Sequence, residues 1–129
     1  GMNAGEMRER TLEFGLRIIR LCQYLKGHAV AEVMGRQLLR CGTSVGANYR
    51  AASLAKSKAD FVAKIKICEE EADEAIYWLE LLMRSGEVDS ARLIPLQQEA
   101  TELRNIMSAS AITARKTQNK FSHDPINCQ

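Results

Sequence analysis

Apolar residues recur along the chain at alternating steps of three and four, the period of a helix that packs in a bundle. The clearest run comprises Phe61, Ile65, Cys68, Ala72, Ala75, Leu79 and Leu82. Ser57 followed by Asp60 is typical of a capping box at the start of a helix. Gly86 suits its C-terminal end, because glycine adopts a left-handed conformation at little cost. The pattern predicts one helix over 57–86, roughly 45 Å long at 1.5 Å per residue.

Three other segments show the same period. The segment 7–26 carries Phe14, Ile18, Leu21 and Leu25, and the segment 29–55 carries Val30, Met34, Leu38, Cys41, Val45, Asn48 and Ala52. The last runs from a cap at Asp89 or Ser90 to about Lys116, and it carries Leu93, Leu96, Ala100, Leu103, Met107 and Ser110. Pro95 must lie near its first turn, where a missing N–H is tolerated. Four helices with short loops predict an all-α, antiparallel up-down-up-down four-helix bundle.

Three glycines, Gly35, Gly42 and Gly46, fall on one side of the second predicted helix. Each costs about 1 kcal/mol of helix propensity relative to alanine. Their common side predicts that another helix approaches the backbone closely there. The alternative is a kink or break near 42–44.

The length of 129 residues suits one domain with a substantial core. We expect that domain over residues 1–118. Helical periodicity stops near Gln118, and the segment 119–129 contains Pro125 and two asparagines. This segment is predicted to be a flexible C-terminal tail.

Composition indicates a globular protein, with 46% hydrophobic and 26% charged residues. No apolar run reaches the ~18 residues of a membrane span, and no basic region followed by an apolar one marks a signal peptide. We therefore expect a cytoplasmic protein with no membrane partner. The four cysteines form no Cys-x-x-Cys pair, which favours reduced, buried thiols over a disulfide framework or metal site.

The residues give little support to catalysis. The acidic run 69–74 lacks the Glu-x-x-His motif of di-iron bundles, since His28 lies in a turn and His123 in the predicted tail. The segment 42–46 lacks the lysine and the preceding strand of a phosphate-binding loop. We expect no catalytic residue, metal or cofactor, and hence no enzyme.

Basic residues gather on the hairpin formed by the second and third helices. They are Arg36, Arg40, Arg50, Lys56, Lys58, Lys64 and Lys66. Such a cluster suits phosphate contacts with RNA or DNA, and the alternative is a solubilising face. A fold about Lys56 also makes Arg40 a candidate ion-pair partner of Asp73 or Glu74. The formal net charge is only +2. We predict no aromatic residues interleaved with these cations on the folded surface, so stacking of single-strand bases is not expected.

More apolar residues are present than one bundle core needs. Those outside the main stripes are Leu12, Leu16, Ile19, Ile67, Trp78 and Leu81. They predict an interface between copies of the chain. The alternative is that they widen the core of the monomer.

Three segments, 37–48, 57–61 and 74–82, together resemble a known family. Their sequences are QLLRCGTSVGAN, SKADF and EAIYWLELL, and they look like the bacterial four-helix-bundle proteins encoded by intervening sequences within large-subunit ribosomal RNA genes. The resemblance covers about residues 7–116. It implies a cytosolic bundle that assembles as a ring, typically a pentamer.

A more distant resemblance is to the accessory protein of diversity-generating retroelements. It implies a pentameric bundle that binds nucleic acid and reverse transcriptase through basic surface, and phosphate contacts at Arg36, Arg40, Arg50, Lys64 and Lys66. Ala51 departs from the family, which often has glutamate after the arginine that matches Arg50. The leading hypothesis is a non-enzymatic homo-oligomer, a pentamer, that binds RNA or DNA. Its rival is a protein-interaction scaffold with a protein partner and no nucleic-acid role.

Overall fold

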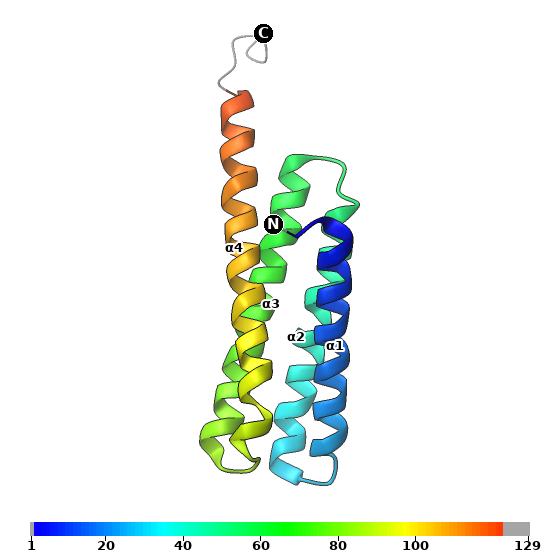
Figure 1. Ribbon diagram of the computed structural model, residues 1–129, viewed down its shortest axis with the longest axis vertical. Helices are drawn as coiled ribbons and strands as arrows, with labels where there is room; N and C mark the ends of the chain where they lie inside the picture. The colour runs from blue at the N-terminus through cyan, green and yellow to red at the C-terminus, as the bar shows by residue number, and fades with distance from the viewer. Residues whose placement is uncertain (1, 123–129) are drawn as a thin grey trace.

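Four helices that run alternately up and down make up the computed structural model, which describes residues 2–122 and the side chains of 2–117 (Figure 1). The helices are α1 (Ala4–Leu25), α2 (Ala29–Ser53), α3 (Lys58–Ser85) and α4 (Ile94–Ser122), with a short 3₁₀ turn, η1 (Ser90–Arg92), before α4. No strand occurs between residues 2 and 122. Among these residues, the structure contains no helix with both the length and the hydrophobicity that a membrane span requires. The predicted all-α four-helix bundle is confirmed.

The first helix begins three residues earlier than predicted, because Asn3 caps it. The side-chain oxygen of Asn3 accepts a hydrogen bond from the backbone N–H of Glu6 at 2.8 Å. Its amide nitrogen donates in turn to the Glu6 carboxylate at 2.7 Å. Free N–H groups of the first turn are thereby satisfied, which stabilises the helix start.

The predicted ends of the third helix are confirmed. Ser57 Oγ accepts from the backbone N–H of Asp60 at 3.0 Å, and Gly86 has a φ of 74°. The predicted cap of the fourth helix is wrong, because the Asp89 carboxylate accepts from Ala91 N–H in η1. Helix α4 begins after η1, and Pro95 is its second residue, as expected for a residue without an N–H.

The predicted apolar stripes fill the core, with few exceptions. Phe14, Leu38, Ile65, Leu79 and Leu103 are among the fully buried side chains. The exceptions lie at or near the stripe ends: Val30 is exposed, whereas Asn48, Phe61 and Ser110 are half-buried.

Helix α2 continues without a break through residues 42–44, so the kink alternative is wrong. Its glycines admit α1 closely. A Cβ atom built on Gly42 would lie 2.7 Å from Ile18, and one on Gly46 would lie 3.2 Å from the backbone oxygen of Thr11. The predicted close approach is confirmed, and α1 is the helix that makes it.

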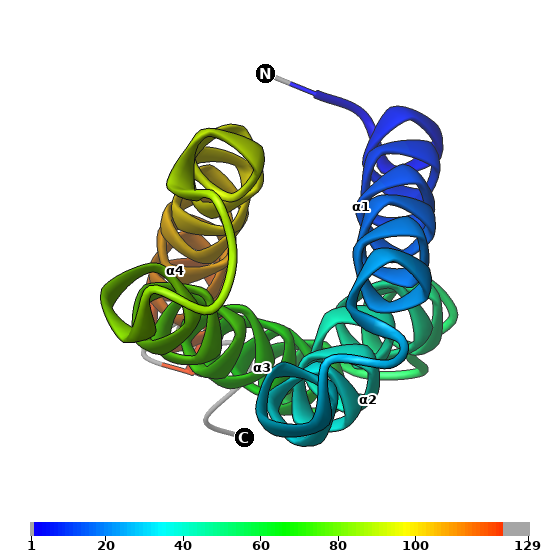
Figure 2. The same ribbon diagram turned by 90° about the horizontal axis from the view of Figure 1, so that it is seen from below.

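Helices α1 and α4 form the outer arms of the bundle, and α2 and α3 join them (Figure 2). The two arms meet over only a short length. There the Arg10 guanidinium donates two hydrogen bonds to the Glu99 carboxylate, at 2.9 and 2.7 Å. The bundle is therefore tightly packed on three sides and more open on the fourth.

Helix α4 runs past its predicted end near Lys116 and reaches Ser122. It extends beyond the other helices at the end where α2 turns into α3 (Figure 1). The predicted tail, 119–129, therefore overlaps the helix over 119–122, and its remainder lies outside the described residues.

Candidate nucleic-acid interface

Three of the seven predicted phosphate-contact residues gather where α2 turns into α3. Arg50 lies in the last turn of α2, Lys56 in the connection, and Lys58 is the first residue of α3. All three are exposed. Within the described residues none of them takes part in an ion pair. We call this end of the bundle, with the start of α1 and the C-terminal turns of α4, the hairpin end.

Two lysines of the predicted set are partly neutralised by carboxylates on their own helix. Lys64 Nζ lies 3.7 Å from Asp60, and Lys66 Nζ lies 2.6 Å from Glu69. The hydrogen bond from Lys66 lowers the pKa of the Glu69 carboxyl below its usual range. A phosphate at either lysine would compete with an existing partner.

Arg40 is held in a network of carboxylates. It pairs with Glu74 and, at 3.3 Å, with Glu71, while Trp78 Nε1 donates to Glu74 at 3.0 Å. The predicted pair with Glu74 is confirmed. Asp73, the other predicted partner, pairs instead with Arg104 of α4 at 2.9 Å.

Arg36 is exposed but lies far from the hairpin end. Fourteen residues separate it from Arg50 along α2, which is roughly 21 Å of helix. Arg36 and the paired Arg40 are therefore separate from the cations at the hairpin end. The seven residues do not form one continuous cationic surface.

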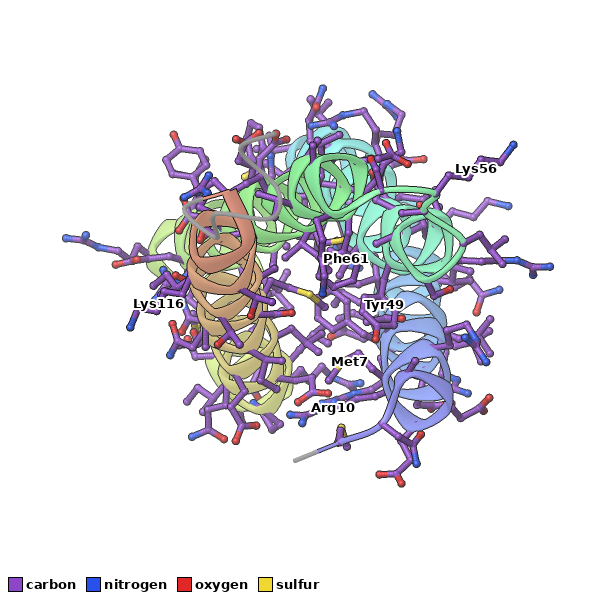
Figure 3. All side chains as sticks on the ribbon, turned by 90° about the horizontal axis from the view of Figure 1, so that it is seen from above. Met7, Arg10, Tyr49, Lys56, Phe61 and Lys116 are labelled. Atoms are coloured by element: carbon purple, nitrogen blue, oxygen red, sulfur yellow. The ribbon has the colours of Figure 1, made fainter. Side chains whose placement is uncertain are left out.

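The hairpin end contains further cations beyond the seven predicted phosphate-contact residues. Arg8 of α1 and Arg50 line the same hollow, and the exposed Arg115 and Lys116 lie in the C-terminal turns of α4. Seen from above, Lys56 and Lys116 project outward on different sides of this end (Figure 3). An up-down topology places the start of α1 and the end of α4 beside the α2–α3 turn. The predicted topology therefore already indicated that cations on these two segments belong to the hairpin end.

Charge is distributed unevenly along the hairpin. Residues 50–66 contain five cations and one carboxylate, whereas the whole chain has a formal net charge of +2. The next stretch, 69–74, contains five carboxylates. The acidic run therefore follows the basic end along α3, and Arg40, Arg104 and Lys66 neutralise part of it.

The six predicted interface residues fall on different surfaces. Leu12, Leu16 and Ile19 are 57%, 39% and 37% exposed, and they line a hollow of about 400 Å³ between α1 and α2. On α3, Leu81 is exposed, while Ile67 and Trp78 are half-buried. Trp78 packs against the edge of the core, so it partly fits the alternative that these residues widen the core.

The cysteines within the described residues are free thiols on packed helices. Burial raises the pKa of Cys41 and of Cys68 to about 12. A thiol with such a pKa stays protonated at neutral pH and is a poor nucleophile. Cys128 lies outside the described residues, and within residues 2–122 no three His, Cys, Asp or Glu side chains are placed to hold a metal ion.

Two aromatic residues lie at the hairpin end beside the cations, so the expectation that no aromatic is interleaved with them is wrong. Tyr49 directly precedes Arg50, and Phe61 lies between Lys58 and Lys64. Tyr49 of α2 and Phe61 of α3 both line a cavity of about 430 Å³ together with Lys56 and Lys58. Tyr49, Phe61 and Lys58 also line a larger cavity of about 750 Å³ that reaches α4. The antiparallel register of α2 and α3 brings both rings to the same cavities, although twelve positions separate them in the chain.

Comparison with known proteins agrees with this fold. Residues 5–109 match the 23S rRNA-intervening sequence protein family. A crystal structure of a protein of unknown function from the S23 ribosomal protein family of Bacteroides thetaiotaomicron is 38% identical, with a TM-score of 0.76. That similarity covers 81% of this chain and 96% of the other. No curated protein is significantly similar to the chain. The chain belongs to the 23S rRNA-intervening sequence protein family.

Proposed function

We propose that this protein is a non-enzymatic homo-oligomer, a ring of five copies in the cytoplasm, that binds RNA or DNA through its hairpin end. The observation that carries the nucleic-acid part is the gathering of Arg50, Lys56 and Lys58 at one end. All three are exposed, and none has an ion-pair partner among the described side chains of 2–117. Cations without a carboxylate partner can contact phosphates and release the counterions bound there.

Assembly is the second part of the proposal. The exposed stripe of Leu12, Leu16 and Ile19 lines a hollow against the small residues Gly46 and Ala47 of α2. Apolar surface of this kind is typical of protein interfaces. A ring would repeat the hairpin end several times, so that weak phosphate contacts would act together on one polyanion.

A salt titration tests the nucleic-acid part. The variant R50A/K56A/K58A is compared with the wild type and with R20A/K26A/R84A, which removes three exposed cations elsewhere. For the hairpin-end variant we expect binding to a labelled oligonucleotide to weaken at least about tenfold, and the salt slope to fall by about two to three, because each lost phosphate contact removes about 0.7–0.9. The control variant should stay within about twofold.

Equal losses in the two variants would contradict a localised interface. No binding by the wild-type protein even at low salt would reject the nucleic-acid role altogether.

Light scattering tests the assembly. The ring predicts a mass of five times the 14.4 kDa chain, and L16D should dissociate it, because a charge in an apolar interface is strongly unfavourable. K26D, which places the same side chain at an exposed site elsewhere, is the control. A wild-type protein with the mass of one chain at micromolar concentration would reject the ring.

The rival function is a protein-interaction scaffold. The hollow between α1 and α2 favours it, because a partner helix with apolar side chains could occupy such a groove. Co-purification of one protein partner that L16D releases, without nuclease-sensitive material, would support the scaffold.

A further inference from the structure

The larger cavity at the hairpin end lies where α1 and α4 diverge. It measures about 750 Å³, within the range of roughly 300–1,000 Å³ typical of sites for small organic groups. Tyr49, Phe61, Met7 and Met107 provide its apolar lining. Tyr49, Phe61 and Met7 project into the space that the helices surround (Figure 3).

Polar groups lie at the same cavity. Lys58 lines it and is exposed, and no ion pair within the described residues includes it. Ser110 and Thr113 contribute hydroxyl groups from α4. The site therefore combines an aromatic lining, hydroxyl groups and one cation that forms no ion pair with any side chain the structure describes.

This combination matches the chemistry of a nucleotide in a single strand. Such sites place aromatic rings against the π-face of a base, while cations contact the adjacent backbone phosphates. In a duplex the bases are stacked and paired, so a base could enter a cavity of this kind only from an unpaired region.

We propose that the hairpin-end cavity receives one unpaired base of RNA or DNA against Tyr49 and Phe61, with Lys58 at the neighbouring phosphate. The inference rests on the proposed nucleic-acid role, and it adds that the preferred ligand is single-stranded. It replaces the expectation from the sequence that base stacking plays no part, because the fold places two aromatic rings beside the basic end.

The first experiment compares ligands of equal phosphate number. Binding of the wild-type protein is measured to a 12-nucleotide thymidine strand, a uridine strand, an abasic strand and a duplex. We expect a base-containing strand, of either sugar, to bind roughly 5- to 150-fold more tightly than the abasic strand, as one stacked base predicts.

The second experiment fills the cavity. Ala109 and Thr113 are exposed and line the cavity, so A109L/T113L should block it without removing a core side chain. Q98L/N105L adds two leucines to exposed sites on α4 that do not line the cavity. We expect the first variant to lose the preference for bases and the second to retain it, with unchanged circular dichroism in both.

A fluorescent base reports on stacking directly. A 2-aminopurine placed in the thymidine strand should be quenched by the wild-type protein and by Q98L/N105L, and less by Y49L/F61L. Because Tyr49 and Phe61 also pack against the core, melting temperatures of the aromatic variant are recorded. If Y49L/F61L unfolds, the comparison of A109L/T113L with Q98L/N105L decides whether a base enters the cavity.

The outcomes separate the two proposals. Equal binding of base-containing, abasic and duplex ligands, all lost in R50A/K56A/K58A, would overturn the base cavity and leave the phosphate-binding end intact. A preference for bases that persists in A109L/T113L would also overturn it. No binding to any ligand would overturn both.

Discussion

Helix α1 contacts its two neighbours in different ways. Against α2 it packs so closely that a Cβ on Gly42 would overlap Ile18 and one on Gly46 would press on the backbone of Thr11. Against α4 it meets over a short length, where Arg10 bridges to Glu99, and beyond this bridge the two helices border a cavity. Small residues thus make one side of α1 closely packed, whereas the other is held by polar contacts and leaves room for a ligand.

The largest expected effect comes from breaking the close contact between α1 and α2. We expect G42L to destabilise the protein by about 3 kcal/mol or more, because the new side chain would overlap Ile18 and force the helices apart. The loss of stability is measured as the difference in unfolding free energy between G42L and the wild type in urea denaturation.

Gly5 offers the matched control, because a Cβ there meets only ordinary contacts, the nearest at 3.4 Å. G5A should be neutral or stabilising by up to about 1 kcal/mol. A G42L protein as stable as the wild type would show that the close contact between α1 and α2 is dispensable.

The bridge between α1 and α4 is the next target. Arg10 and Glu99 are 23% and 15% exposed, so R10M leaves a mostly buried carboxylate without its partner. We expect a loss of about 1–3 kcal/mol. Hydrogen exchange should rise in the first turns of α1, while α2 and α3 keep their protection. An equal increase in hydrogen exchange in all four helices would show that the bridge does not stabilise the start of α1 locally.

Acid should weaken the same bridge without any mutation. The hydrogen bonds from Arg10 lower the pKa of the Glu99 carboxyl, so its stabilising effect is complete above the pKa of the unfolded chain. It is lost as the pH falls from about 4.3, the ordinary pKa of glutamate, through the lowered pKa of folded Glu99.

The Glu69 carboxyl also has a lowered pKa, so the wild type alone does not isolate Glu99. We expect the difference in unfolding free energy between wild type and R10M to shrink as the pH falls below about 4.3. A difference that stays constant with pH would show that the ionised form of Glu99 contributes nothing.

The two sides of α1 also differ in what the sequence could predict. Residues such as Phe14, Ile18 and Leu38 revealed the core because burial imposes the helical period on nearby positions. Gly42 and Gly46 predicted the close contact because glycine inside a helix needs a packing reason. The bridge gave no such signal, because Arg10 and Glu99 are 89 positions apart and nothing local to either requires the other.

The candidate site was predicted only in part for the same reason. The sequence identified Arg50, Lys56 and Lys58 as basic, and the predicted hairpin gave the Arg40–Glu74 pair. It did not give the pair of Arg40 with Glu71, or that of Asp73 with Arg104 of α4. Tyr49 adjoins Arg50 and Phe61 lies close to Lys58 in the sequence, but only the register of α2 and α3 shows that both rings line one cavity. Long-range pairing, rather than residue type, decides which charges remain free.

The smallest expected effect comes from removing the exposed partner of Arg10, and it is compared with the effect of removing the buried partner, Glu99. Arg10 also lies 3.2 Å from Glu102, which is 67% exposed. We expect E102Q to change the unfolding free energy by less than about 1 kcal/mol, because water screens an exposed pair, whereas E99Q should cost more. Both variants remove one negative charge near the same guanidinium, so the comparison holds the charge change constant and varies only burial. Equal effects would mean that charge number, and not the buried hydrogen-bonded geometry, holds α1 to α4.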